Sequence, residues 1–256
     1  MISIVTITYN DFNGLKRTLS SIPDYDFIES VVINGGSDRS TLEYLSSLKC
    51  KVINEKDEGI ADAFNKGIVN SSGNAIMFLN SGDELIEPEY LKESEEILIK
   101  KTEVDFIHSN LLFIDSKGTE LYMKPPFCNL GRGLPYLHPT MIVRKSVFDQ
   151  IGLFNKDYRI AMDFDFIVRL GKAGCKGFYI SDNAVVKMEG TGRSVEQEFD
   201  AIKECYKSLK RNKFLNLKNS FGMIVRILLF SMRKLMTLIG LGELLRSLKK
   251  KKHSKK

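Results

Sequence analysis

The sequence predicts an α/β fold in which a mixed, mostly parallel sheet is flanked by helices. In the first eighty residues, four apolar runs of strand length end near Thr8, Ile33, Ile53 and Leu79, and each of the first three precedes a helical pattern. Such alternation is typical of βαβ units. The last run, residues 76–79, has no polar alternation, which fits a strand covered on both faces. At 256 residues, the chain can hold one large domain with an appendage.

The three segments between these strands have apolar residues at helical spacing, which predicts helices with one buried face. Asn10 or Asp11 can cap the first helix, because short polar side chains accept amide hydrogen bonds there. No GxGxxG pattern follows any of the strands, so a dinucleotide-binding Rossmann domain has little support. The residues that mark the helices are Leu15, Leu19 and Ile22; Leu42, Leu45 and Leu48; and Ala61, Phe64 and Ile68.

The rest of the body continues this pattern less regularly. A helix is predicted between Pro88 and Lys101, with its charged face toward water, and a strand over residues 104–112. Residues 113–118 have the composition of a hairpin turn. The stretch 124–137 holds three prolines and two glycines. Loops of this length are often covers over sites or disordered segments.

The polar segment after the fourth strand is the first candidate site. In open α/β sheets, ligands bind at the carboxyl edge of the strands, where Asn80, Ser81, Gly82 and Asp83 are expected. Gly82 permits a tight turn or the close approach of a phosphate. Asp83 can hold a divalent cation together with substrate phosphates. The same residue types also form ordinary turns, so a plain polar turn stays open as the alternative.

Three polar residues in the second half are further candidates. His138 precedes an apolar run and can be structural or functional. Asp163 and Asp165 lie among aromatic residues at the start of a predicted helix. There Asp163 would accept amide hydrogen bonds and be favoured by the helix dipole. An N-cap role and a catalytic role therefore both remain open for this residue.

The cysteines and the N-terminus indicate a reducing, cytoplasmic environment. The four cysteines are scattered without the paired spacing of a zinc site or a disulfide framework. Met1 leads directly into a strand-like run, with neither the basic leader nor the cleavage site of a signal peptide. We therefore expect the protein on the cytoplasmic side.

Charge divides the chain into an acidic body, residues 1–202, and a basic tail, residues 203–256. The chain carries 38 Lys and Arg against 32 Asp and Glu, but 16 of the basic residues and only two of the acidic ones lie in the tail. The stretch 214–248 is rich in large apolar residues, yet basic residues such as Arg226 and Arg233 interrupt it. This pattern predicts an amphipathic helix lying in a membrane interface rather than crossing the bilayer.

The basic end of the tail favours an anionic lipid surface as its partner. Four consecutive lysines at 249–252 and two at 255–256 would add electrostatic attraction to such a surface. The alternative is an amphipathic helix docked on the domain, followed by a solvated basic end. Nucleic-acid binding would need basic groups spread over a groove with stacking aromatics. Here they are confined to the tail among aliphatic residues, so no nucleic-acid partner is expected.

Several motifs over residues 2–195 resemble, in the same order, those of family 2 glycosyltransferases with a GT-A fold, of the type found in bacterial polysaccharide assembly. The resemblance implies a Rossmann-like nucleotide-binding domain with a donor half over about 1–112 and an acceptor half over about 113–202. The motifs are the Thr-Tyr-Asn turn at 8–10, an Asp-Gly-Gly-Ser-type loop at 34–38, the segment 57–67, the Phe-Leu-Asn-Ser-Gly-Asp run at 78–83, and the block from 138 to 169.

The resemblance implies a nucleotide-sugar donor, expected to be a UDP-sugar, with Mn²⁺ or Mg²⁺ bound to its diphosphate by Asp83. Leaving-group charge must be neutralised as the glycosidic bond breaks, and a cation does so. Asn34 stands where the family commonly has an aspartate that reads the nucleobase. The identity of the nucleobase therefore stays open. The residues implied in donor binding are Thr8, Tyr9, Asn10, Asn34, Asp57, Lys66, Asn80, Ser81 and Arg193, the last in a glycine-rich stretch that resembles the family's flexible loop.

The same resemblance implies that His138, Asp165 and Arg169 bind the acceptor. Asp163 would take the proton from an acceptor hydroxyl that attacks the anomeric carbon opposite the leaving diphosphate. A single displacement of this kind inverts the anomeric centre. Met162 replaces an acid that often precedes the catalytic aspartate, so Asp165 remains a second candidate for the base.

The predicted function is a metal-dependent, inverting hexosyl- or N-acetylhexosaminyltransferase at the cytoplasmic face of the membrane. Its acceptor would be a glycan or a polyprenyl-linked saccharide in cell-surface polysaccharide synthesis. Two alternatives stay open, because a fold alone does not name a reaction. One is a catalytically inactive GT-A module that binds nucleotide sugars, and the other is a GT-A-like nucleotidyltransferase.

Overall fold

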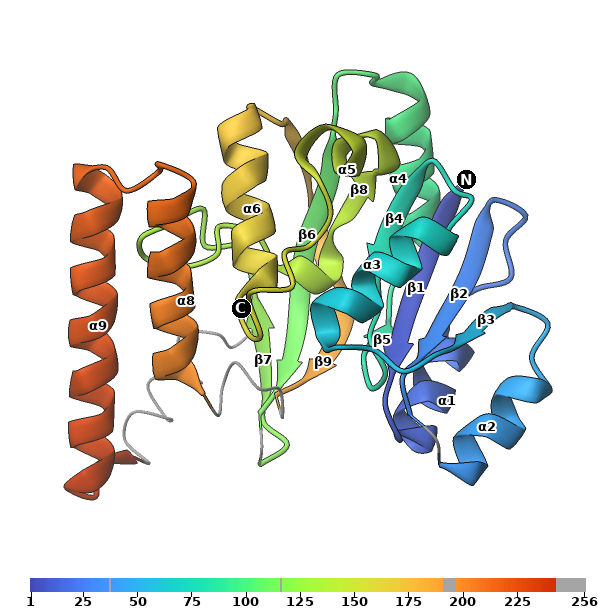
Figure 1. Ribbon diagram of the computed structural model, residues 1–256, viewed down its shortest axis with the longest axis horizontal. Helices are drawn as coiled ribbons and strands as arrows, with labels where there is room; N and C mark the ends of the chain where they lie inside the picture. The colour runs from blue at the N-terminus through green and yellow to red at the C-terminus, as the bar shows by residue number, and fades with distance from the viewer. Residues whose placement is uncertain (37, 116, 191–196, 243–256) are drawn as a thin grey trace.

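The computed structural model describes residues 1–36, 38–115, 117–190 and 197–242, and it confirms the predicted α/β fold (Figure 1). The strands are β1 (Ile2–Thr8), β2 (Ile28–Asn34), β3 (Lys51–Asn54), β4 (Ala75–Phe78), β5 (Glu84–Leu85), β6 (Phe106–Ile114), β7 (Glu120–Met123), β8 (Ile142–Arg144) and β9 (Gly177–Glu189). The helices are α1 (Phe12–Ser21), α2 (Arg39–Ser46), α3 (Ile60–Asn70), α4 (Glu89–Lys100), the 3₁₀ turn η1 (His138–Thr140), α5 (Lys145–Ile151), α6 (Met162–Ala173), α8 (Glu198–Arg211) and α9 (Leu217–Leu238).

The donor half brings four parallel strands to one edge. Within the described residues, a single nine-stranded sheet has the order β3-β2-β1-β4-β8-β6-β9-β5, with β7 paired to β6. Thr8 at the end of β1 pairs with Asn34 of β2, which in turn pairs with Asn54 of β3. The amide of Ser81, which follows β4, donates to the carbonyl of Ile7 at 3.1 Å. The carboxyl ends of all four strands therefore meet, as the sequence predicted.

Central strands alternate their side chains between two apolar layers. In β4, Ile76 and Phe78 face the layer formed with α3, α5 and α6, whereas Met77 faces the layer formed with α4, as does Leu79 just after the strand. All four side chains are at most 3% exposed. The unbroken apolar run of this strand follows from this arrangement, because both of its faces are covered by helices.

The acceptor half adds strands that the sequence pattern did not predict. β8 lies antiparallel to β4 and β6, and β9 runs parallel to β6 with register shifts near Asn110. β8 has three residues, too few for a periodic signal. β9 mixes polar and apolar residues in its 13 positions. The predicted hairpin is confirmed, with β6 and β7 joined by a turn in which Gly118 has φ of 75°.

The C-terminal helices extend the body, with α8 packed against α6 and α9 packed against α8 (Figure 1). Cys205 and Leu209 of α8 and Met223 of α9 belong to the same apolar cluster as α6. The approach of α9 to the loop after β7 is close, since a Cβ on Gly131 would lie 2.0 Å from the carbonyl oxygen of Asn219. The proposed division at residue 202 falls inside α8 and stays a prediction. No helix in the described part of the chain is both long and apolar enough to cross a bilayer.

Candidate active site

The loops after β1 and β2 are tied to each other at the shared edge of the sheet. The amide of Gly35 donates to the carbonyl of Thr8 at 3.1 Å, and the amide of Asp38 donates to the side chain of Asn10 at 3.1 Å. Asn10 has φ of 51°, a left-handed conformation that Asn tolerates. Tyr9, between these residues, is 69% exposed. The structure thus brings together the residues predicted from the Thr-Tyr-Asn turn and the loop at 34–38.

Asn34 lies inside this arrangement with its amide group already engaged. It donates to the carbonyl of Gly36 and the side chain of Asn54, at 3.1 and 3.0 Å, and accepts from the amide of Gly36 at 3.1 Å. Asp57 lies against this loop, because a Cβ on Gly35 would be 1.9 Å from a carboxylate oxygen of Asp57. Asn34 therefore holds the loop and Asp57 lies against it, and the donor-binding roles predicted for both stay predictions.

Lys66 of α3 is engaged by groups of its own helix and of the segment before it. Its ammonium donates to the carbonyl of Lys56 at 2.7 Å and forms ion pairs with Glu55 at 3.1 Å and Asp62 at 3.5 Å. These contacts fix the segment before α3. The donor-binding role predicted for Lys66 stays a prediction.

The segment after β4 is held by the first helix. Thr18 of α1 donates through its hydroxyl to the carbonyl of Asn80 at 3.1 Å and accepts from the amide of Gly82 at 3.0 Å. Ser81 donates to the carboxylate of Asp11 at 2.8 Å. Asp11 is also the N-cap of α1, as predicted, accepting from the amide of Gly14 at 3.0 Å. The segment is therefore fixed on both sides and is more than a plain surface turn.

Asp83 is a buried carboxylate beside a second acid. Asp83 is only 6% exposed, and burial, together with the negative charge of Glu189 at the end of β9, raises its pKa to about 7. Sequence reasoning assigned no role to Glu189, because only the sheet brings β9 beside this segment. Two carboxylates suit Mg²⁺ or Mn²⁺, which commonly takes one or two of them plus substrate phosphates. No group of three or more metal-ligating side chains occurs in the described residues.

A cavity of about 470 Å³ lies next to this edge and contains the predicted base. Asp163, His138 and Asn80 line it together with apolar side chains such as Met162 and Leu137. His138 stacks on Phe64 and Phe78, with ring centroids 5.7 and 5.9 Å apart. Burial lowers the pKa of His138, so its ring is neutral near pH 7. The cavity therefore brings a residue of the donor segment, Asn80, together with two from the acceptor half.

The environment of Asp163 suits a group that exchanges a proton. Burial raises the pKa of its carboxyl group, whereas the positive charge of Arg226, and that of His138 when protonated, lowers it. Asp163 lies in the first turn of α6 and accepts from the amide of Phe164 at 2.6 Å. The N-cap of this helix is Ala161, so the N-cap alternative for Asp163 is wrong. A carboxylate that is partly desolvated and lines a cavity is a candidate general base.

Arg226 was expected among the charges that interrupt the apolar tail, but it turns toward the body. Its Nη1 atom is buried and has no hydrogen-bond partner in the described part of the chain. Its charge acts on Asp163 and on the thiol of Cys205. Only the docking of α9 reveals this placement, since helical spacing alone does not say which face is buried.

Asp165 and Arg169 lie on the face of α6 that packs against its neighbours. Asp165, 2% exposed, pairs with Arg169 at 2.9 Å and accepts from Ser208 at 2.7 Å and Asn212 at 3.1 Å. The guanidinium of Arg169 also donates to the carbonyls of residues 151–153 at 2.6 to 2.9 Å. These contacts give both residues a structural role, and the acceptor-binding role predicted for them stays a prediction. They also leave Asp163 as the better placed of the two candidate bases.

Arg193 and the rest of the predicted glycine-rich loop at 191–196 lie outside the described residues, as do the lysines after residue 242. The role predicted for Arg193 at the donor phosphates stays a prediction. The described part of this stretch ends at Glu189 and Gly190, beside the segment that carries Asp83.

Comparisons with known proteins agree with this geometry. The model of the family described as glycosyl transferase family 2 matches residues 3–152. An uncharacterized glycosyltransferase of Mycobacterium tuberculosis is 31% identical over 179 residues, which cover 66% of this chain and 68% of that protein.

Two solved structures share the fold. Residues 1–349 of S. aureus TarS, in complex with UDP-GlcNAc, match 88% of this chain and 71% of that chain, with a TM-score of 0.66 and 16% identity. The mannosyltransferase PcManGT from Pyrobaculum calidifontis, in complex with GDP-Man and Mn²⁺, matches 96% of this chain and 78% of that chain, with a TM-score of 0.60 and 15% identity.

Proposed function

Because the chain belongs to glycosyltransferase family 2, we propose that it transfers a sugar from a UDP-sugar to a hydroxyl of a glycan or lipid-linked acceptor, with inversion of the anomeric centre. The observation that carries this proposal is the position of Asp163. Its carboxylate lines a cavity beside Asn80, where the donor-side strands end. Two solved structures with this fold are complexes with sugar nucleotides, TarS with UDP-GlcNAc and PcManGT with GDP-Man.

In this mechanism Asp163 accepts the proton of the attacking hydroxyl. The oxygen forms a bond to the anomeric carbon while the bond to the nucleoside diphosphate breaks on the opposite face. His138 lies beside Asp163 and is neutral near pH 7, so it adds no charge to the cavity. General-base catalysis of this type contributes roughly 10²- to 10⁴-fold to a rate.

The donor diphosphate would be held through Asp83, with Glu189 as the second acid near the cation. Mn²⁺ or Mg²⁺ supplies charge neutralisation for the leaving diphosphate. The residues fit such an ion, because a buried carboxylate that must ionise near pH 7 is stabilised by a cation. Ionisation also precedes binding, so affinity for the cation is expected to rise as pH increases through about 7.

Donor and metal binding can be tested together by thermal shift. UDP with Mn²⁺ is expected to raise Tm, because a ligand that binds only the native state stabilises that state. At a ligand concentration one hundred times Kd, the free energy of unfolding rises by about 2.7 kcal/mol. Asp83→Ala should abolish the metal-dependent part of this shift. Asp149→Ala, which removes an exposed carboxylate on α5, is the control and should keep the full shift. Stabilisation by UDP that is equal with Mn²⁺ and with EDTA would contradict the assignment of Asp83, and no stabilisation by any nucleotide would favour a protein without transferase activity.

We further propose that the protein attaches to the cytoplasmic face of the membrane through α9. The inner face of this helix is docked, with Asn219, Gly222 and Met223 buried. Its outer face leaves large apolar side chains exposed, among them Phe221 at 68% and Leu228 at 62%. Apolar contact with the bilayer, together with the lysines of the tail, gives the two contributions that interfacial attachment needs.

Sedimentation with vesicles tests this attachment without removing the docked helix. Replacing Phe221, Leu228 and Leu235 with Ser removes three exposed side chains spaced seven residues apart on α9. We expect this variant to lose most of its binding to phosphatidylglycerol vesicles. Val69→Ser, at a position 69% exposed on α3, is the control and should bind like the unmodified protein. Full binding by the triple variant would refute the proposal.

A further inference from the structure

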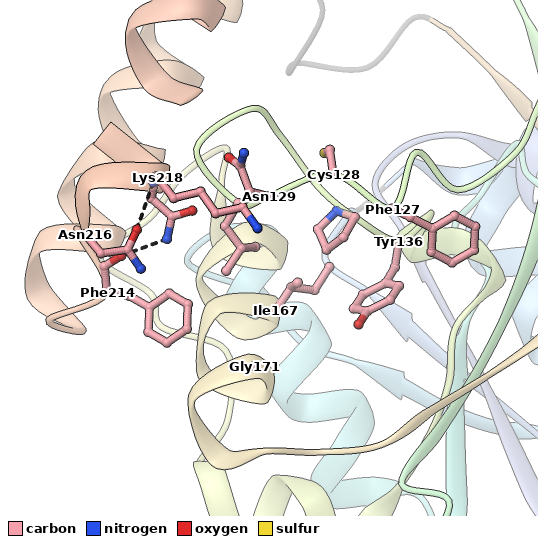
Figure 2. A pocket seen from close by; sticks show the side chains of 12 residues that line it. Phe127, Cys128, Asn129, Tyr136, Ile167, Gly171, Phe214, Asn216 and Lys218 are labelled. Carbon is pink, nitrogen blue, oxygen red and sulfur yellow. Dashed lines mark hydrogen bonds between the residues drawn. The ribbon is translucent and has the colours of Figure 1, made fainter. Parts of the chain in front are cut away.

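A second cavity, of about 410 Å³, lies where the loop after β7 meets α6 and the start of α9 (Figure 2). Phe127 and Tyr136 come from the loop, Ile167 from α6, and Phe214 from the connection between α8 and α9. Its volume falls in the range of small-molecule sites, about 300–1,000 Å³. None of the functional residues discussed above lines this cavity.

The polar groups around the cavity are largely committed to holding the protein together. The side chain of Asn219 donates to the carbonyl of Phe214 at 2.8 Å and accepts from the amide of Gly131 at 3.3 Å. Asn216 accepts from the amide of Asn219 at 2.9 Å. A sugar would need many free polar partners. Apart from Cys128, Asn129 and Lys218, the rest of the wall is aromatic and aliphatic, which suits an apolar chain.

The cavity adjoins the active site through Tyr136, which lines both. In the same loop, Leu134 lines the active-site cavity and Pro135 lines the second cavity. A molecule whose hydroxyl reaches Asp163 can therefore extend past Tyr136 toward α6 and α9.

The cavity also adjoins the proposed membrane-facing surface. Lys218, in the first turn of α9, lines it (Figure 2). Leu217 and Phe221, which flank Lys218 in the helix, are 92% and 68% exposed. Among the described residues that line the cavity, one is a lysine and none is acidic. Its chemistry therefore suits an apolar chain that carries a phosphate.

We propose that this cavity binds the apolar chain of a phosphate-linked lipid acceptor, with Lys218 near the phosphate. The inference rests on the proposed transferase function and names the class of its acceptor. A chain held here would leave the bilayer beside α9 and point its saccharide into the cavity of Asp163. The active site would in this way select acceptors by their lipid as well as by their sugar.

Binding of an apolar chain can be followed with a single reporter, because the chain contains no Trp. Phe127→Trp places an indole at a lining position that is 59% exposed. Decyl phosphate, used below its critical micelle concentration, should shift the fluorescence emission of this tryptophan to the blue in a saturable manner. Inorganic phosphate should cause no such shift. Octyl phosphate should bind roughly 15-fold more weakly, since each buried methylene contributes about fourfold.

The blocking variant is Gly171→Leu. Gly171 lines the cavity from α6, and a Cβ there would meet no atom within 4 Å, so a larger side chain can enter the space without a clash. We expect Gly171→Leu to weaken binding of decyl phosphate at least tenfold, and Gly171→Ala to change it less than threefold. Both variants should fold as stably as the reporter protein or more so, because each replaces a glycine in a helix.

The readouts separate this inference from the function on which it rests. The UDP-dependent thermal shift should be unchanged in Gly171→Leu. If no variant showed a UDP-dependent thermal shift, that result would count against the proposed transferase function. Retained binding of UDP without saturable binding of decyl phosphate would overturn the cavity's role, as would equal binding of decyl phosphate by Gly171→Leu. Loss of vesicle binding in Gly171→Leu would also overturn it, because the cavity would then hold a membrane phospholipid rather than the acceptor.

Discussion

Replacing Asp163 with Asn is expected to lower kcat by roughly 10²- to 10⁴-fold, because the amide cannot accept the proton of the attacking hydroxyl. The substitution keeps the shape of a side chain at the start of α6. Donor binding should persist, since the segments at the ends of β1, β2 and β4 do not depend on this carboxylate. Steady-state turnover tests the loss of catalysis, and the UDP-dependent thermal shift tests whether donor binding persists. Both are measured on the same preparation. Unchanged turnover in Asp163→Asn would exclude this residue as the base.

The pH profile of the unmodified protein adds a signature that a structural role would not give. Burial raises the pKa of Asp163 above its usual value of 3.8, and only the ionised form can accept a proton. The rate should therefore fall as pH decreases through this raised pKa. Removing the nearby cation with Arg226→Gln would raise the pKa further and move the acidic limb to higher pH. A limb that stays in place after this change would argue against proximity of Arg226 to the base.

Sequence patterns predicted the donor-side sheet well because each of its strands and turns has a signal within a short stretch of sequence. The strand at 75–78 is covered on both faces and its residues are therefore uniformly apolar, and the turn after it must then lie at the carboxyl edge. The acceptor half was less predictable. β9 pairs with β6 through an irregular register, and nothing in its mixed composition indicates which strand it joins.

Side-chain roles that depend on tertiary contacts could not be predicted from local patterns. Lys66 and Arg169 have the residue type expected of phosphate or acceptor ligands, yet carbonyls and carboxylates brought in by other segments occupy them. Glu189 and Arg226 show the opposite case. Their neighbours are Asp83 and Asp163, more than sixty positions away in the chain, and only the folded sheet and the docked α9 place them there.

The largest effect on stability is expected from Asp165→Ala, only two residues from the base. Asp165 is buried, and its carboxylate joins Arg169 of its own helix to Ser208 and Asn212 of α8. Removing one partner of a buried ion pair leaves the other charge uncompensated, which typically costs about 3–5 kcal/mol. Urea unfolding should therefore show a free energy of unfolding lower by that amount.

Asp157→Ala is the matched control, because Asp157 also pairs with an arginine, Arg211 of α8, at 2.7 Å. Both side chains of that pair are more than half exposed, so solvent screens the interaction and its loss should cost far less than the loss of Asp165. The contrast tests whether burial, rather than the pairing of charges, makes Asp165 essential to the packing of α8. Equal costs for the two variants would contradict its structural role and return Asp165 to consideration as a base.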